Sequence, residues 1–192
     1  MRFYIMGQPV NAALSSDAII HIFNRTFFAS HHTKLVAGDD EPLYLPASTE
    51  CPYHRIIFAH GYFSSALHEI AHWLVAGEQR RLKVDYGYWY EPDGRNELQQ
   101  AEFEKVEVLP QAIEWALSVS CGASFDVSSD NLSGIFINRL AFKQKVYQQL
   151  LHLLEKGFSE RTQCLLFACQ KAFQRDALTA EDFEYQGMYQ LV

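Results

Sequence analysis

The segment Ser65-Ala-Leu-His-Glu-Ile-Ala-His-Trp73 carries an H-E-x-x-H pattern, His68-Glu69-Ile70-Ala71-His72, inside a stretch predicted to be helical. Residues four apart on a helix lie one turn apart on the same face. His68 and His72 are therefore spaced to hold one metal ion, and Glu69 is placed to act on a metal-bound water or a substrate. The question becomes which metal is held, and for which chemistry.

The flanking segments predict a strand, a turn and a capped helix. Residues 55–60 are mostly apolar and β-branched, as in a buried strand, and Gly61 ends them. Ser64 or Ser65 is expected to cap the helix that carries the two histidines, and Gly77 to close its last turn.

Apolar residues at helical spacing predict further helices. These cover residues 17–30, 96–119, 135–156 and 159–173, and Pro110 is expected to interrupt or bend the second. Residues 43–45 form a short extended piece, residues 82–90 are aromatic and β-prone, and residues 179–182 resemble a capping box. The pattern predicts one domain over residues 1–192, a mostly helical α+β domain with a small β-sheet beside the metal helix.

Composition limits the function classes. The chain has 192 residues, 48% of them hydrophobic, which is enough for a folded core. Its formal charge of −7 argues against a broad phosphate-binding surface, so no direct nucleic-acid partner is expected. The 4 cysteines are widely spaced, which favours free thiols. With no signal peptide or membrane span predicted, we expect a cytoplasmic protein with no membrane partner.

A third metal ligand is expected from the helix after Asn96, because two histidines alone hold a metal weakly. At about 100° per residue, Glu102 falls within an apolar arc, and a carboxylate buried there requires a cation. Glu102 is therefore the predicted third ligand. The arc is formed by Leu98, Val106, Leu109, Ile113 and Ala116, whereas Glu97, Glu104, Glu107 and Glu114 are placed away from it.

Two alternatives to this role stay open: a salt bridge from Glu102 to Arg95, or a helix register different from the one assumed. Other candidate ligands have weaker support, because each stands alone or departs from an established motif. They are His54, His60, Glu78, Glu107 and Asp126.

Ligand type does not decide the metal. With zinc, the arrangement resembles a metallopeptidase that has a downstream glutamate ligand, and Glu69 would deprotonate the bound water. With iron(II), two imidazoles and a carboxylate form the facial triad of non-haem oxygenases. The third alternative is a binding module that the metal only stabilises. The surroundings of Glu102 lack the usual peptidase residues, which weighs against the peptidase.

Beyond the metal motif, the chain resembles the elongation factor P hydroxylase family over nearly its whole length. Several segments carry the resemblance in one order. They are Gly38-Asp-Asp-Glu-Pro-Leu-Tyr-Leu-Pro-Ala47, Pro52-Tyr-His-Arg-Ile-Ile-Phe-Ala-His-Gly61, Ser65–Trp73, Val84-Asp-Tyr-Gly-Tyr-Trp-Tyr90, Pro92-Asp-Gly-Arg95, Phe103-Glu-Lys-Val-Glu-Val108 and Asp130-Asn-Leu132.

The resemblance implies a non-haem iron hydroxylase, of monooxygenase type, that modifies translation elongation factor P after translation. Its target would be the lysine side chain at the tip of that factor, already extended by a β-lysyl group. His68, His72 and Glu102 would hold Fe(II), although zinc or another divalent metal can occupy such a site. The fold would be metallopeptidase-like (zincin-like). The sequence has no H-x-D motif on a β-rich framework, so no 2-oxoglutarate is expected.

A lysyl substrate carries ammonium groups, which carboxylates and aromatic faces recognise. We expect Asp39, Asp93, Tyr88 and Tyr90 to line the entrance of the pocket. The alternatives are a core-facing strand for the two tyrosines and solvated loops for the two acids. Glu69 is assigned a catalytic role in moving protons or holding a metal-bound water.

Overall fold

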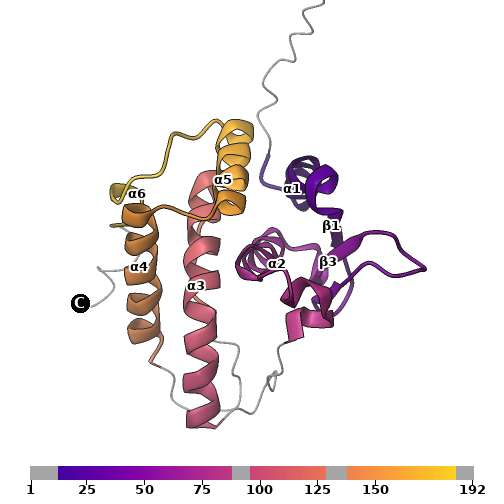
Figure 1. The fold of residues 1–192 in the computed structure, drawn as a ribbon. Coiled ribbons are helices and arrows are strands. Elements are labelled where there is room, and N and C mark those ends of the chain that lie inside the picture. Colours follow the sequence, from indigo (N-terminus) through magenta and orange to yellow (C-terminus); the bar gives the residue numbers. More distant parts are fainter. Residues whose placement is uncertain (1–12, 88–95, 129–137, 185–192) are drawn as a thin grey trace, which may run out of the picture.

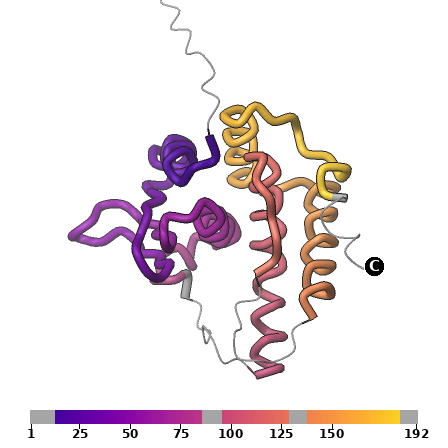
Figure 2. Tube along the Cα trace, turned by 180° about the vertical axis from the view of Figure 1, so that it is seen from behind, coloured from indigo at the N-terminus to yellow at the C-terminus, as the bar shows by residue number. Residues whose placement is uncertain are grey.

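The long helix α3 (Glu97–Cys121) stands at the centre of the molecule. The structure, a computed structural model, describes residues 13–87, 96–128 and 138–184. On one side of α3 lie helix α2 (Phe63–Val75), a small sheet and helix α1 (Ser16–His31); on the other side lies helix α4 (Arg139–Lys156), as both views show (Figures 1 and 2). The described part is thus mostly helical with a small sheet, which confirms the α+β prediction.

The sheet has three short strands in the order β1-β3-β2. Strand β1 (Thr33–Ala37) runs parallel to β3 (His54–Phe58), and β2 (Leu43–Leu45) runs antiparallel to it. The predicted buried strand at 55–60 is confirmed as β3, shortened at its end, and β2 matches the expected extended piece. Strand β1 was not predicted. It is only five residues long and directly follows a helix, and so short a run gives little hydrophobic alternation from which a strand could be predicted.

Helix α1 is tied to the edge of this sheet. Ser15 caps its start by accepting a hydrogen bond from the amide of Ala18 at 3.2 Å. Asn24 then pairs with both backbone groups of Leu35 in β1, accepting from its amide at 2.8 Å and donating to its carbonyl at 3.3 Å. The side chain of Asn24 therefore satisfies an edge strand that would otherwise present unpaired groups.

Helix α2 begins two or three residues earlier than predicted and lacks the expected serine cap. Tyr62 is the capping residue and makes no side-chain cap bond, while the hydroxyl of Ser65 accepts from the amide of Ala59 at 3.2 Å. The serine prediction was wrong because the turn between β3 and α2 uses that hydroxyl. The helix ends at Val75, with Ala76 rather than Gly77 as its cap. Its apolar side packs into the core through Leu67, Ile70, Trp73 and Leu74.

The carboxyl end of α2 is held by Arg161 of helix α5 (Glu160–Phe173). Its guanidinium donates to the carbonyls of Trp73, Leu74 and Ala76 at 3.3, 2.9 and 2.8 Å. It also lies 4.9 Å from the centre of the Trp73 ring. A cation on the last carbonyls satisfies groups that a helix leaves unpaired and interacts favourably with its dipole.

Helix α3 starts with a full capping box between Asn96 and Gln99 and continues through Pro110 to Cys121. The expectation that Pro110 interrupts the helix was therefore wrong, whereas the alternative of a bend at Pro110 stays a prediction. The region 82–87, predicted to be β-prone, instead forms the 3₁₀ turns η2 (Arg80–Leu82) and η3 (Val84–Gly87). The last elements are α5 and the short α6 (Glu181–Glu184). The predicted capping box is confirmed in part: the amide of Thr179 donates to Asp182 at 2.7 Å, whereas the amide of Asp182 bonds to the carbonyl of Thr179 and not to its hydroxyl.

Two broader expectations concern thiols and membranes. All four cysteines are free, as predicted. Among the described helices, each is too short or too polar to cross a bilayer.

Replacement of Arg161 by alanine is expected to lower the free energy of unfolding by about 2 to 4 kcal/mol, because three carbonyls at the end of α2 lose a charged donor. Urea denaturation monitored by circular dichroism measures this loss. Arg139→Ala is the matched control. Arg139 pairs with Asp126 in an exposed salt bridge, so its loss should cost less than about 1 kcal/mol. Equal losses in the two variants would contradict the proposed role of Arg161.

Candidate metal centre

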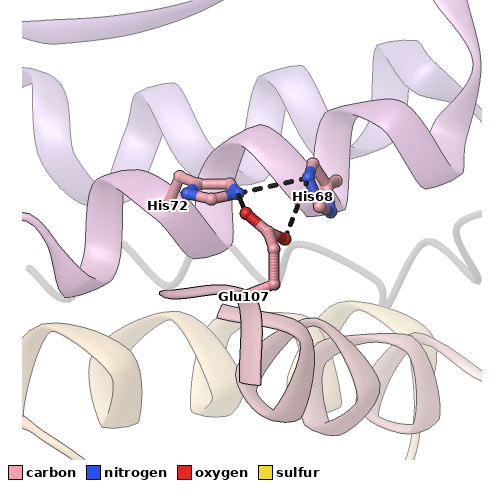
Figure 3. Close-up of side chains that lie close together, drawn as sticks. All are labelled: His68, His72 and Glu107. Atoms are coloured by element: carbon pink, nitrogen blue, oxygen red, sulfur yellow. Dashed lines mark hydrogen bonds and ion pairs between the residues drawn. The ribbon is translucent and has the colours of Figure 1, made fainter. Parts of the chain in front are cut away.

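His68 and His72 point from one face of α2 toward α3 (Figure 3). Their Nε2 atoms lie 3.2 Å apart, and their ring centres are 4.7 Å apart. The pair is placed by the apolar residues on the other side of α2, since Leu67, Ile70, Ala71 and Leu74 are buried in the core. The predicted one-turn spacing of the two imidazoles is thus confirmed.

Glu107 rises from α3 between the two imidazoles (Figure 3). Its Oε1 lies 3.2 Å from Nε2 of His72, and its Oε2 lies 3.8 Å from Nε2 of His68. Its side chain is only 1% exposed. Ligand atoms about 2.1 Å from one ion lie roughly 3.0 to 3.4 Å from one another in tetrahedral or octahedral sites. The donor types and spacings therefore fit a divalent cation, and His68, His72 and Glu107 form a group able to hold one.

Glu102, the predicted third ligand, does not lie at this group. Its side chain is 72% exposed and pairs with Lys105 one turn along the same helix. The prediction failed because the assumed buried arc was wrong: Leu98 is 80% exposed and Val106 is exposed as well. The register alternative, left open from the sequence, is the correct one.

A polar row on α3 could have revealed Glu107. Glu107, Gln111, Glu114 and Ser118 recur at intervals of four, three and four residues, which place them along one face. All four are buried in the structure. A continuous polar row inside a helix that is apolar around it indicates partners on a facing helix, here α2.

Two members of the row hold their neighbours. Glu114 accepts a hydrogen bond from Nδ1 of His68 at 2.8 Å. Gln111 donates to Oε2 of Glu107 at 3.2 Å and to the carbonyl of Ser128 at 2.8 Å, and its own oxygen accepts from the amide of Ser128 at 3.1 Å. Neither residue was assigned a role from the sequence.

The carboxylates and imidazoles shift one another's protonation. Burial by itself lowers the pKa of His68, but the neighbouring Glu114, with Glu107 and Glu69, raises it to about 10. For Glu107, burial acts to raise the pKa, and the contacts with His72, His68 and Gln111 bring it down to about 2. The site therefore favours an ionised Glu107, and a cation would compete with a proton for His68.

Glu69 lies beside the histidines on α2, and the pKa of its carboxyl group shifts in the opposite direction from that of Glu107. Burial raises the pKa of its carboxyl group, and the neighbouring His68 and His72 act to lower that pKa. A raised pKa makes a carboxyl group better suited to general acid–base catalysis than an ordinary glutamate.

The residues predicted to contact the substrate are mostly outside the described residues, namely Tyr88, Tyr90 and Asp93. Asp39 is described and exposed, and its backbone carbonyl accepts from the amide of His60 at 3.1 Å. Among the weaker candidate ligands, His54 is engaged elsewhere, because its Nδ1 accepts from the amide of Ala47 at 3.0 Å.

A family model described as elongation factor P hydroxylase matches residues 22–183. The chain belongs to the elongation factor P hydroxylase family. The elongation factor P lysine hydroxylase of Haemophilus influenzae is 55% identical over 149 residues, which are 78% of this chain and 84% of that relative. The family resemblance inferred from the sequence is thereby confirmed, and the matched range contains both α2 and α3.

We expect a pH signature in protein stripped of metal by a chelator. The contribution of His68 to stability should be fully present below its unfolded pKa near 6.5 and should be lost as pH rises toward about 10, because the folded state holds the proton more tightly. Unfolding free energies of the wild type and His68→Gln, compared from pH 6 to 10, should therefore converge as pH rises. A difference that is constant or grows with pH would contradict the pairing with Glu114.

Proposed function

We propose that the chain is an iron-dependent hydroxylase of the lysine side chain in elongation factor P, acting after that lysine has received a β-lysyl group. The observation that carries this proposal is the convergence of two imidazoles and a buried carboxylate in a member of the elongation factor P hydroxylase family. The name of the relative, which specifies lysine, supports the substrate residue. A translation factor as substrate also supports a cytoplasmic location.

In this proposal, His68, His72 and Glu107 hold the metal, with Glu107 in the position that the sequence suggested for Glu102. When bound, iron(II) would supply the activation of dioxygen at positions that three protein ligands leave free. The chain's own contribution is to direct two imidazole nitrogens and one ionised carboxylate toward one point, and a bound metal would displace the proton that His68 otherwise holds. Contacts with His72, His68 and Gln111 keep Glu107 ionised over a wide pH range.

Glu69 is proposed to move protons at this site. It lies directly next to His68 on α2, and burial raises the pKa of its carboxyl group. A carboxyl group poised in this way can accept a proton from a substrate or water and return it. In the described geometry it is not needed as a ligand, because the three groups already present the donors that a facial site requires.

Of the three proposed ligands, His68 has the most exposed side chain, at 22%, whereas the side chain of Glu107 on α3 is almost completely buried. We propose that the lysyl side chain approaches from that side. Asp39, Asp93, Tyr88 and Tyr90 remain the proposed residues that meet its ammonium groups. The carboxylates would attract the positive charge, and the aromatic faces would pack on the methylene chain.

The same three donors would serve a zinc peptidase, and we propose that the packing of α2 on α3 is metallopeptidase-like. Family membership nevertheless favours the hydroxylase over the peptidase. The two functions differ in what they require of the metal: redox activity for the hydroxylase, and only polarisation of a carbonyl and a water for the peptidase. The proposed enzyme is a monooxygenase-type hydroxylase without 2-oxoglutarate.

The direct test is product formation on β-lysylated elongation factor P. Incubation with the iron(II)-loaded protein, dioxygen and a reductant should add the mass of one oxygen atom to the modified lysine, located by peptide mass spectrometry. The zinc-loaded protein should give no such product. Peptide cleavage by the zinc form, with no oxygen insertion by the iron form, would favour the peptidase instead.

Glu107→Ala should abolish metal binding and hydroxylation, because the site loses its single anionic donor. The loss of metal affinity should exceed the roughly 10- to 100-fold that removal of an outer partner costs. Glu102→Ala on the same helix is the matched control, and it should bind metal and react like the wild type. Metal content after dialysis and product yield are the measurements. A metal-depleted Glu102→Ala protein would return the third ligand to Glu102.

A further inference from the structure

Helix α3 buries two further polar side chains near Glu107, the residue proposed to bind the metal. Gln111 is completely buried and Glu114 is 8% exposed. Burying a carboxylate or an amide is unfavourable unless each polar atom finds a partner. Glu114 hydrogen-bonds to His68 and Gln111 to Glu107, so each buried side chain finds its partner in a proposed metal ligand.

Glu114 determines which nitrogen of His68 carries hydrogen. Its carboxylate accepts from Nδ1 at 2.8 Å, so that nitrogen must be protonated. In the neutral ring, the lone pair then lies on Nε2, the atom that faces Nε2 of His72 at 3.2 Å and the carboxylate of Glu107. The contact therefore fixes both the tautomer and the orientation of the imidazole toward the ligand group.

Gln111 determines the orientation of the Glu107 carboxylate. Its amide oxygen accepts from the backbone amide of Ser128, so its NH₂ group is directed toward Oε2 of Glu107 and the Ser128 carbonyl. The backbone of Ser128 thus leaves Gln111 able only to donate to the carboxylate. Oε2 is held on that side, and Oε1 remains directed at His72 at 3.2 Å.

We propose that Glu114 and Gln111 are positioning residues of the metal centre: Glu114 presents Nε2 of His68, and Gln111 presents the carboxylate of Glu107. This inference rests on the proposed function, because it assumes that these atoms bind a cation. It adds that α3 supplies one ligand, Glu107, and also the residues that hydrogen-bond to two of the three ligands, His68 and Glu107. It also connects the ligand Glu107 to the backbone at Ser128 through a single buried amide.

The experiment is a titration of chelator-stripped protein with Co²⁺, followed by its visible absorbance. Glu114→Gln keeps a hydrogen-bond acceptor but removes the charge, whereas Glu114→Ala removes both. We expect affinity to fall about 10-fold for Glu114→Gln and about 100-fold for Glu114→Ala, the range known for partners of ligating histidines. Gln111→Leu, which keeps the volume but removes the donor, should also weaken binding about 10-fold.

A readout that a purely structural role would not change is the tautomer of His68 in the Zn²⁺-loaded protein. Nitrogen-15 NMR should show hydrogen on Nδ1 in the wild type and in Glu114→Gln, and loss of that protected signal in Glu114→Ala. Glu102→Gln, an exposed glutamate on the same helix, is the control and should match the wild type in both measurements. Circular dichroism confirms that each titrated variant is folded, and Glu114→Gln tests the inference if Glu114→Ala does not fold.

The outcomes separate this inference from the function on which it rests. Wild-type affinity in Glu114→Gln and Gln111→Leu, with the wild type binding normally, would overturn the positioning roles and leave the metal centre intact. A wild-type protein that binds neither Co²⁺ nor Zn²⁺ would overturn the metal centre itself, and the positioning roles with it. Graded loss across the Glu114 variants, with an unchanged control, supports both.

Discussion

The structure depends on the contact between buried carboxylates of α3 and the imidazoles of α2. Glu107 and Glu114 are removed from water, and such groups are strongly destabilising unless a positive charge or good donors meet them. His68 and His72 meet them, within 3.2 Å for their shortest contacts. The pairing therefore fixes how two helices of distant sequence lie against each other. Arg161 adds a second constraint, because it holds the end of α2 from another helix.

The two histidines could be predicted from the sequence, but the carboxylate that meets them could not: Glu102 was expected, and Glu107 is found there. The H-E-x-x-H spacing is local, so helical geometry alone brings His68 and His72 together. The partner on α3 depends on which face of a 25-residue helix is buried, and near its start α3 exposes apolar residues such as Leu98. Apolar periodicity was therefore a poor guide there. The better guide was the row of polar residues beginning at Glu107, because buried polar groups require partners.

The errors in capping and strand assignment come from contacts with other segments, which local sequence patterns do not reveal. Ser65 was expected to cap α2, but its hydroxyl accepts from Ala59 in the turn from β3. A serine near a helix start can serve either the helix or the preceding turn, and sequence does not distinguish the two. Strand β1 is supported by pairing with β3 and by Asn24 of α1, which are contacts between distant segments. The family relationship could be recognised from the sequence because it rests on many segments, not on one.

The placement of the three candidate ligands has a consequence for the whole molecule. His68 and His72 belong to the half that contains the sheet, and Glu107 belongs to the half built around α3 (Figure 1). A cation shared among them would act as a cross-link that closes the chain between α2 and α3, and closure of that kind reduces the entropy of the unfolded state. The supply of that cation during synthesis would then influence how firmly the two halves are joined, and so how well the protein resists proteolysis.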